Sequence, residues 1–297
     1  MKLQINTDVS KGEWVAFIEQ NRCKNQSGSV ATLEIDFSMS SFIEPFYLVS
    51  LACLIEEYSI NGTTISFSPF DKLELREYLL SGYFLSFWKK SFDRYEDYFT
   101  ASNSTSLRLW KIDSTKVSEY VYKAQNYYEI RYLQEKNATP LNISLAELFN
   151  NIIEHSASPV SGFVLNQYYP KNGKLKIALC DLGVGIAHKI NSYLAGKGEA
   201  TLSDKEAIIK AFELSFSSKS IPQNRGRGLD TLKTIVLSCN GTLRLIANNY
   251  SLSFNVKGKG KFDGFSLKNE FCGTLFEIIL DTNAFDKKSE DEFDLLF

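Results

Sequence analysis

"ELFNNIIEHS", residues 147–156, places two carboxylates, two carboxamides and a histidine in one short run. At about 100° per residue, the apolar and polar side chains around this run fall on opposite sides of a helix. The apolar side carries Leu141, Leu145, Leu148, Phe149 and Ile152, and the polar side carries Glu147, Asn151, Glu154 and His155. The spacing predicts an amphipathic helix, but periodicity alone leaves open whether its polar side meets water or a ligand.

The segments that flank this helix come in the order helices, then strands. Upstream, residues 114–137 are typical of a helix capped near Ser114. Downstream, residues 162–181 contain two β-rich runs around a Lys-Asn-Gly turn and predict a hairpin that ends at Asp181. A further helical run (204–216), a helix opened by the glycines of residues 225–232 and β-rich runs (242–247, 250–256 and 273–280) follow. This order predicts an α+β layer sandwich with mostly antiparallel strands.

The polar run "TASNSTS", residues 100–106, has the composition of a linker and divides the chain. We expect an N-terminal domain at 1–100, a second domain at 107–282 and an acidic tail at 283–297. In the first domain, strand-like residues 31–37 and 63–68 flank a probable helix with Pro45 in its first turn. The N-terminal domain is therefore predicted to be a small α/β module.

Composition narrows the possible functions. The 33 Lys and Arg residues balance 35 Asp and Glu residues, so no basic field favours nucleic acid or anionic lipid. The apolar runs are too short to span a bilayer, and no signal-peptide core is present, so we expect a cytoplasmic protein with no membrane partner. Five widely spaced cysteines without a CxxC pair are typical of buried thiols in a reducing compartment. Phosphate-loop, GxGxxG and HExxH motifs are missing.

Four stretches follow one another along the chain: the polar helix at 147–155, "DLGVGI" at 181–186, "RGRGLDTL" at 225–232 and "GTLFEI" at 273–278. Together they resemble the N, G1 and G2 boxes and the last-strand threonine of the GHKL ATPases, the superfamily of gyrase, heat-shock chaperone, histidine-kinase and MutL ATP-binding domains. The resemblance covers about residues 110–282. It implies a two-layer α/β sandwich of the Bergerat type with a mixed, mostly antiparallel sheet, and a site for ATP and Mg²⁺.

The resemblance gives Glu147 the role of general base and Asn151 the role of Mg²⁺ ligand. Both roles suit the residue types, because the two side chains lie one turn apart on one helix face and carboxamide oxygen is a hard ligand. Asp181 would accept a hydrogen bond from the adenine amino group, and Thr274 would complete the adenine end. Leu182 stands where many members carry Asn, which puts a polar contact at that position in doubt.

The remaining nucleotide contacts are expected from two glycine-containing stretches. Gly183 and Gly185 would let the backbone approach the base closely, whereas Gly226 and Gly228 precede a helix whose N-terminus and amides can hold phosphate oxygens. The expected contacts are Gly183, Gly185 and Ile186 in the first stretch, and Arg225, Gly226, Arg227, Gly228 and Leu229 in the second, with Lys219 in the intervening lid. Solvated arginines remain an alternative for Arg225 and Arg227. His155 is expected to pack or cap near the phosphates rather than accept phosphate.

Residues 33–67 resemble a STAS or anti-anti-sigma domain in their strand, loop, helix, strand order. Glu44 and Pro45 replace the usual Asp-Ser pair at the helix start, so phosphorylation at the usual position is impossible. We expect the N-terminal domain to bind a protein partner, and a homodimer is conceivable. Three functions share this ATP site: slow ATP hydrolysis coupled to lid closure and partner association, a serine kinase of the anti-sigma-factor type, and a nucleotide-gated module without catalysis.

Overall fold

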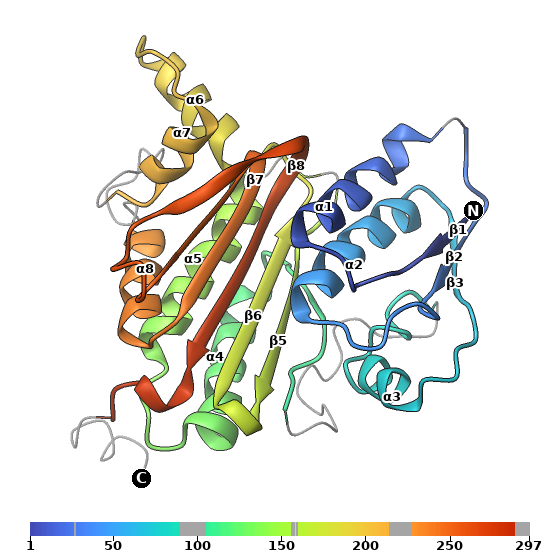
Figure 1. Ribbon diagram of the computed structural model, residues 1–297, viewed down its shortest axis with the longest axis horizontal. Helices are drawn as coiled ribbons and strands as arrows, with labels where there is room; N and C mark the ends of the chain where they lie inside the picture. Colours follow the sequence, from blue (N-terminus) through green and yellow to red (C-terminus); the bar gives the residue numbers. More distant parts are fainter. Residues whose placement is uncertain (27, 90–104, 156–157, 159, 214–226, 289–297) are drawn as a thin grey trace.

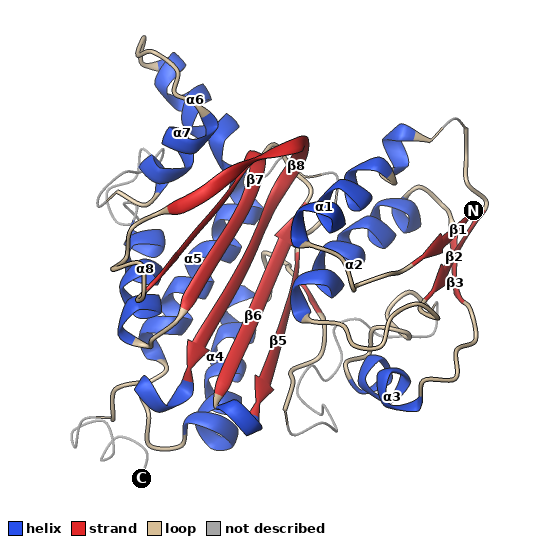
Figure 2. Ribbon diagram, viewed as in Figure 1, coloured by secondary structure: helices blue, strands red, loops and turns tan. Residues whose placement is uncertain are grey.

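The protein is described by a computed structural model, whose described residues are 1–26, 28–89, 105–155, 158, 160–213 and 227–288. Their strands form two separate sheets (Figures 1 and 2). We call residues 1–89 the N-terminal unit and residues 105–288 the C-terminal unit, because each contains one of the sheets.

The N-terminal unit alternates short strands with helices. Its elements are β1 (Lys2–Gln4), α1 (Lys11–Gln20), a 3₁₀ turn (Cys23–Asn25), β2 (Thr32–Asp36), α2 (Pro45–Ile60), β3 (Thr64–Phe67) and α3 (Leu73–Ser81). The strands pair in the order β1-β2-β3, and both pairings are parallel. The strand, helix, strand order expected over residues 31–68 is confirmed. Helix α1, which starts with a capping box formed by Ser10 and Glu13, was not predicted.

The C-terminal unit contains a five-stranded sheet in the order β4-β5-β6-β8-β7. The strands are β4 (Trp110–Lys111), β5 (Phe163–Tyr169), β6 (Lys174–Asp181), β7 (Thr242–Asn255) and β8 (Asp263–Asp281). The helices are α4 (Val117–Tyr128), a π-helical turn (Glu129–Leu133), α5 (Thr139–His155), α6 (Ile186–Gly196), α7 (Asp204–Ala211) and α8 (Arg227–Ser238); Pro170–Asn172 and Thr282–Ala284 form 3₁₀ turns. The α+β class is confirmed. The expectation of a mixed sheet is wrong for the described strands, since all four pairings of this sheet are antiparallel.

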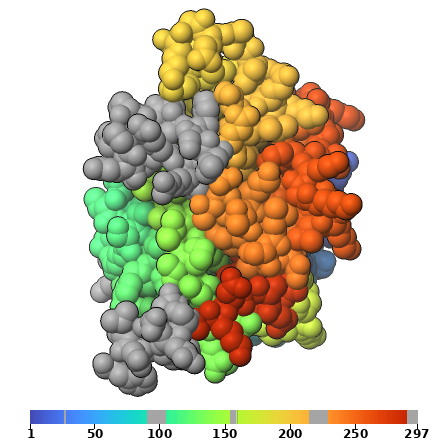
Figure 3. Space-filling view, turned by 90° about the vertical axis from the view of Figure 1, so that its left-hand side faces the viewer, coloured from blue at the N-terminus to red at the C-terminus, as the bar shows by residue number. Residues whose placement is uncertain are grey.

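Helices α4, α5 and α8 cover one face of the five-stranded sheet (Figures 1 and 3). The apolar residues of β6 explain how the sheet packs on both sides, because successive residues of a strand point to opposite faces. Leu175, Ile177 and Leu179 join the core beneath these helices, whereas Ala178 and Cys180 belong to the core on the other face. The apolar side predicted for α5 is buried in the first of these cores. Helices α6 and α7 pack against each other beyond one end of the sheet (Figure 1).

The N-terminal unit covers the second face of this sheet (Figure 1). Helices α1 and α2 lie between the two sheets, and the core on this side contains residues of both units, including Phe46, Leu54, Phe163 and Leu275. The two-layer sandwich expected for the C-terminal unit therefore gains a third layer. Strands β1–β3 add a fourth layer on the far side of α1 and α2 (Figure 2).

Helix α2 is the most buried element of the N-terminal unit. Every residue from Pro45 to Tyr58 is buried. Burial on all sides explains its sequence, because a helix between two sheets needs apolar residues around its whole circumference. Even so, no helix among the described residues is long and apolar enough to cross a membrane.

Ion pairs connect the two units across this buried interface. Glu44 at the start of α2 binds Lys176 on β6, and Glu56 near its end binds Lys111 on β4 at 2.8 Å. Glu277, which is 3% exposed on β8, binds Lys11 of α1. Each pair satisfies a charge that an apolar interface would otherwise leave without compensation.

Residues beside both predicted boundaries of the second domain make contacts with the C-terminal unit. Residues 100–104 of the expected linker are not among those described, but Ser106 already bridges to Gln167 at β5. The tail expected from residue 283 begins within the fold: Phe285 is 5% exposed, and Lys288 binds Glu129 at 2.5 Å. Within this predicted tail, residues 289–297 are not among those described.

Candidate functional site

Asp181 and Thr274 meet at the ends of neighbouring strands. They are direct partners in the antiparallel register of β6 and β8. Both side chains point toward the helical layer, because Leu179 and Phe276, two residues away on each strand, belong to that core. Asp181 is 2% exposed and Thr274 is 7% exposed. The two residues that sequence reasoning assigned to the adenine end are therefore brought together.

The Asp181 carboxylate is only partly compensated. Its Oδ1 accepts a hydrogen bond from the Gly183 amide at 2.8 Å, and the neighbouring Thr274 side chain also lowers the pKa of the carboxyl. Burial raises the pKa of Asp181 to about 6, although the Gly183 amide and the charge of Lys189 act in the opposite direction. A further hydrogen-bond donor here would favour the ionised carboxylate.

Asn248 fixes the loop that follows Asp181. Its side chain donates to the Val184 carbonyl at 3.0 Å and accepts from the Ala187 amide at 3.2 Å. Gly185 is required at this contact, since its φ is +79° and a Cβ would lie 2.4 Å from the Asn248 Oδ1. Sequence reasoning missed Asn248. Its only local signal is an asparagine inside an otherwise β-rich run.

The other residues of this loop take different positions. Gly183 is buried and donates its amide to Asp181. Leu182 is buried in the core beneath the N-terminal unit, on the opposite side of the sheet from Asp181, so it offers no polar contact to a ligand on the helical side. Ile186 is half-buried as the first residue of α6 and packs against the helical core.

A bulge in β8 lies beside Asp181. On β7 the adjacent residues Ala247 and Asn248 pair with Thr274 and Phe271, so Cys272 and Gly273 have no partners on β7. Gly273 has φ +148°, and a Cβ there would lie 2.2 Å from the Asp181 carbonyl oxygen. The bulge therefore needs glycine at this position.

Glu147 and Asn151 lie half-buried on α5, one turn apart as predicted. The Lys189 ammonium of α6 donates to the Asn151 carbonyl at 3.4 Å, and its charge also acts on Asp181. Lys189 thus lies between the polar side of α5 and the Asp181 carboxyl of the predicted adenine end, and sequence reasoning missed it. The side chains of Glu154 and His155 are not described.

The predicted phosphate end is described only in part. Lys219, Arg225 and Gly226 lie outside the described residues. Helix α8 begins at Arg227 and Gly228, in the glycine-containing stretch where a helix was expected to open. Leu229 is half-buried and packs against the helical core, so its side chain acts in packing.

A cavity of about 720 Å³ lies between the two units. Arg22, Lys24 and Asn61 line it from the N-terminal unit, and Leu182, Val184 and Cys272 line it from the C-terminal unit. Its walls include neither Asp181 nor Thr274. Gly183 and Asn248 also line it, so the cavity borders the predicted nucleotide site at the loop that follows Asp181.

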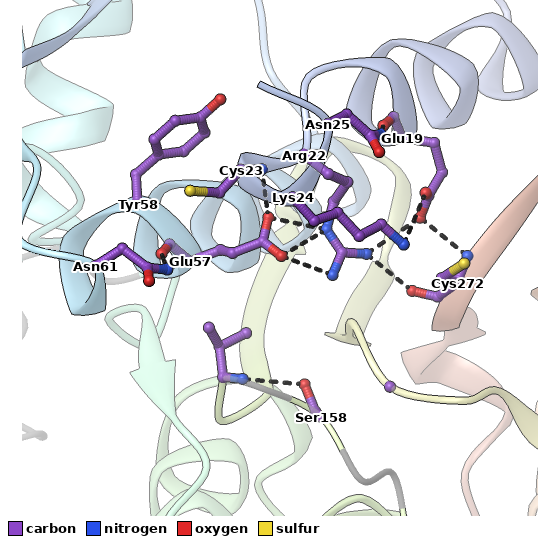
Figure 4. Close-up of polar contacts among 12 residues, drawn as sticks. Glu19, Arg22, Cys23, Lys24, Asn25, Glu57, Tyr58, Asn61, Ser158 and Cys272 are labelled. Carbon is purple, nitrogen blue, oxygen red and sulfur yellow. Dashed lines mark hydrogen bonds and ion pairs between the residues drawn. The ribbon is translucent and has the colours of Figure 1, made fainter. Parts of the chain in front are cut away.

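Arg22 occupies the centre of a buried polar network beside this cavity (Figure 4). Its Nη2 and Nε bind Glu57 at 2.8 and 2.9 Å, and its Nη1 binds Glu19 and the Cys272 carbonyl, each at 3.2 Å. Glu19 also accepts from the Cys272 amide at 2.9 Å. The network therefore links the ends of α1 and α2 to the β8 bulge.

No protein-family model matches this sequence, and no curated protein matches it either.

Proposed function

We propose that this protein binds Mg-ATP on the helical side of its five-stranded sheet and hydrolyses it slowly, in the manner of a GHKL ATPase. The observation that carries the proposal is the buried Asp181–Thr274 pair. The two residues are 93 positions apart in the sequence, yet they are direct strand partners and face the helical layer that contains Glu147 and Asn151. Residues of three of the predicted motifs thus lie on one side of the sheet.

The adenine end would bind through Asp181. An exocyclic amino group donates to the carboxylate and supplies the stabilisation that this buried group lacks. Thr274 lies beside it and can hydrogen-bond the base directly or through a water. Gly183 and Gly185 keep the loop close to the base, while Asn248 holds the loop in place.

The reacting end would use the polar side of α5. Glu147 accepts a proton from a water molecule as the water oxygen attacks the γ-phosphorus and ADP leaves. Asn151 offers a carboxamide oxygen, which suits Mg²⁺ because this ion prefers oxygen ligands and takes most of the others from phosphate and water. The bound Mg²⁺ would neutralise charge on the phosphates. Lys189 supports this end by binding the Asn151 backbone.

A kinase that phosphorylates its own N-terminal unit is less well supported. Pro45 is the first residue of α2 and has no hydroxyl. Ser40 is 0% exposed and donates its hydroxyl to the Ile5 carbonyl at 2.8 Å. Among the nearby serines, Ser41 is exposed, but it precedes the helix by several residues. We therefore expect a kinase of this type to phosphorylate a hydroxyl on a separate partner.

Incubation with γ-labelled ATP and Mg²⁺ tests the proposal and separates it from its rivals. We expect release of free labelled phosphate, which Glu147→Ala lowers on the order of 10²-fold without loss of ATP binding. Label on a partner protein would instead support the kinase, and retained intact ATP would support the non-catalytic module. Absence of any ATP binding by calorimetry would refute the nucleotide site itself.

A further inference from the structure

The β8 bulge depends on the N-terminal unit for its hydrogen bonds. A bulge leaves backbone groups without strand partners, and buried backbone groups are costly to leave unpaired. Cys272 has no pairing residue on β7, and β6 pairs with β8 only as far as Thr274. The Cys272 amide and carbonyl are bound instead by Glu19 and Arg22, from the end of α1 and the residues after it.

The guanidinium of Arg22 is held rigidly for this contact. Arg22 is 2% exposed and binds both oxygens of Glu57, which is 4% exposed on α2. Glu57 also accepts from the Cys23 amide at 2.9 Å. Figure 4 shows the guanidinium between Glu57 on one side and Cys272 on the other. Both helices between the sheets therefore act on the bulge through one side chain.

The same bulge contacts the adenine end of the proposed site. Gly273 lies against the Asp181 carbonyl, and Thr274 follows it in the chain. The positive charge of Arg22 also favours the ionised form of the Asp181 carboxyl and lowers its pKa. Asn248, which holds the loop after Asp181, lies on β7 where the bulge begins. A displacement of Cys272 would therefore move the residues on both sides of the base.

We propose that Arg22, held by Glu57 and assisted by Glu19, is a positioning residue for the nucleotide site, so that docking of the N-terminal unit and nucleotide binding are coupled. The inference rests on the proposed function. If docking of the unit strengthens nucleotide binding, the nucleotide must strengthen docking by the same factor, because coupling is reciprocal. The N-terminal unit would then report the nucleotide state of the C-terminal unit through the bulge.

Calorimetry on full-length variants tests the positioning role. Arg22→Lys keeps the positive charge but loses the planar fork that binds Glu57, Glu19 and the Cys272 carbonyl together. We expect its affinity for Mg-ATP to fall about 5-fold or more, the lower end of typical coupling between sites. Lys176→Met is the matched control, because it removes a contact between the units at the opposite end of α2, and its affinity should equal that of the wild type.

The outcomes separate the two proposals. Wild-type protein that binds no Mg-ATP would refute the proposed function. Wild-type binding together with equal affinity in Arg22→Lys would refute the positioning role and leave the function intact. Equal losses in Arg22→Lys and Lys176→Met would also refute it, because general loosening of the interface would then explain the effect.

A measurement on the wild-type protein covers the case in which Arg22→Lys fails to fold. Cys23 and Cys272 are partly exposed, whereas Cys53, Cys180 and Cys239 are buried. Both partly exposed thiols line the cavity between the units, whose walls do not include Asp181 or Thr274. We expect saturating Mg-ATP to slow alkylation of Cys272 and Cys23, measured by mass spectrometry. Unchanged rates in protein shown to bind Mg-ATP would overturn the coupling.

Discussion

The burial of Asp181 suits ligand binding, because at neutral pH it lowers the stability of the fold. A carboxyl with a raised pKa stabilises the fold only in its protonated form, so this contribution is present below about pH 4 and is lost as the pH rises through about 6. At neutral pH the fold contains a buried, partly compensated charge. Such a residue is expected where a ligand completes the hydrogen bonding.

The first prediction concerns the stability of Asp181→Asn. The carboxamide oxygen can still accept from the Gly183 amide, and the buried charge is removed. We expect the free energy of unfolding at pH 7.5 to increase by on the order of 2 kcal/mol, because a pKa raised from 3.8 to about 6 corresponds to a few kcal/mol. Urea denaturation should show this gain shrinking toward pH 4. A variant less stable than the wild type at pH 7.5 would contradict the assignment.

The pH dependence of ATP binding gives the second prediction. An adenine amino group donates best to the ionised carboxylate, so affinity should rise as the pH increases through about 6 and level off above it. Calorimetry in buffers of different ionisation enthalpy should detect proton release near pH 6. Asp181→Asn should bind ATP more weakly by a few kcal/mol at pH 7.5 and lose this pH dependence. A flat profile in the wild type would argue against contact with Asp181.

Substitution of Glu147 should affect ATP turnover, whereas substitution of Asn151 should affect ATP affinity. Glu147→Ala should retain ATP affinity and lower turnover on the order of 10²-fold, the usual scale for loss of a general base. Asn151→Ala should lower the affinity only in the presence of Mg²⁺. Asn150→Ala, on the same helix, is the matched control and should change neither quantity. Normal turnover in Glu147→Ala would remove that residue from the chemistry.

At the scale of single elements, the β8 bulge depends on Gly273. Alanine at this position must adopt a φ of +148° and would meet the Asp181 carbonyl at 2.2 Å, so the backbone has to shift. We expect Gly273→Ala to lower the free energy of unfolding by more than about 1 kcal/mol. Gly12→Ala in α1 is the control, since no atom lies within 4 Å of the added Cβ, and chemical denaturation should show no loss there. Equal stability of the two variants would mean that the bulge tolerates a side chain.

The elements that could be predicted from sequence are those with a strong local pattern. The leucine spacing of α5 and the apolar run of α2 each predicted a helix, and the Lys-Asn-Gly turn predicted the β5–β6 hairpin. Helix α6 was not predicted, because the glycines before it suggested a loop. The apolar run of α2 also gave no indication of which sheet covers it.

Some residues of the candidate site could be predicted from the sequence, and others could not. The resemblance to the GHKL ATPases implied that Asp181 and Thr274 would lie together, and the strand register makes them direct neighbours. Asn248, Lys189 and Arg22 were missed, since each acts through a partner far away in sequence. Arg22, for example, binds a carbonyl 250 residues later. No local pattern carries such information.

At the scale of the whole molecule, the five-stranded sheet is buried on both faces. The face under α1 and α2 carries apolar residues such as Phe163, Leu165 and Leu275, all at most 3% exposed. The five-stranded sheet in turn covers the surfaces of α1 and α2 that face it. A protein partner of that unit would therefore meet the side formed by β1–β3 and α3 (Figure 1).

The fifth prediction follows from this burial. A fragment of residues 105–297 expressed alone should expose a large apolar sheet face and aggregate, because exposed patches of this kind drive association. Co-expression with residues 1–104 should restore a soluble 1:1 complex, which size-exclusion chromatography with light scattering can measure. A soluble, monomeric, folded fragment would show that the N-terminal unit is dispensable for covering the sheet.

The position of α2 between the two sheets also affects synthesis on the ribosome. Helix α2 ends at Ile60, whereas β8, part of the sheet that covers it, ends at Asp281. At typical elongation rates the apolar helix therefore waits roughly 10 to 40 s for its covering sheet. During that interval the nascent chain presents an apolar surface to the cell, so we expect chaperone binding to concentrate on the segment around α2 until the last strand has emerged.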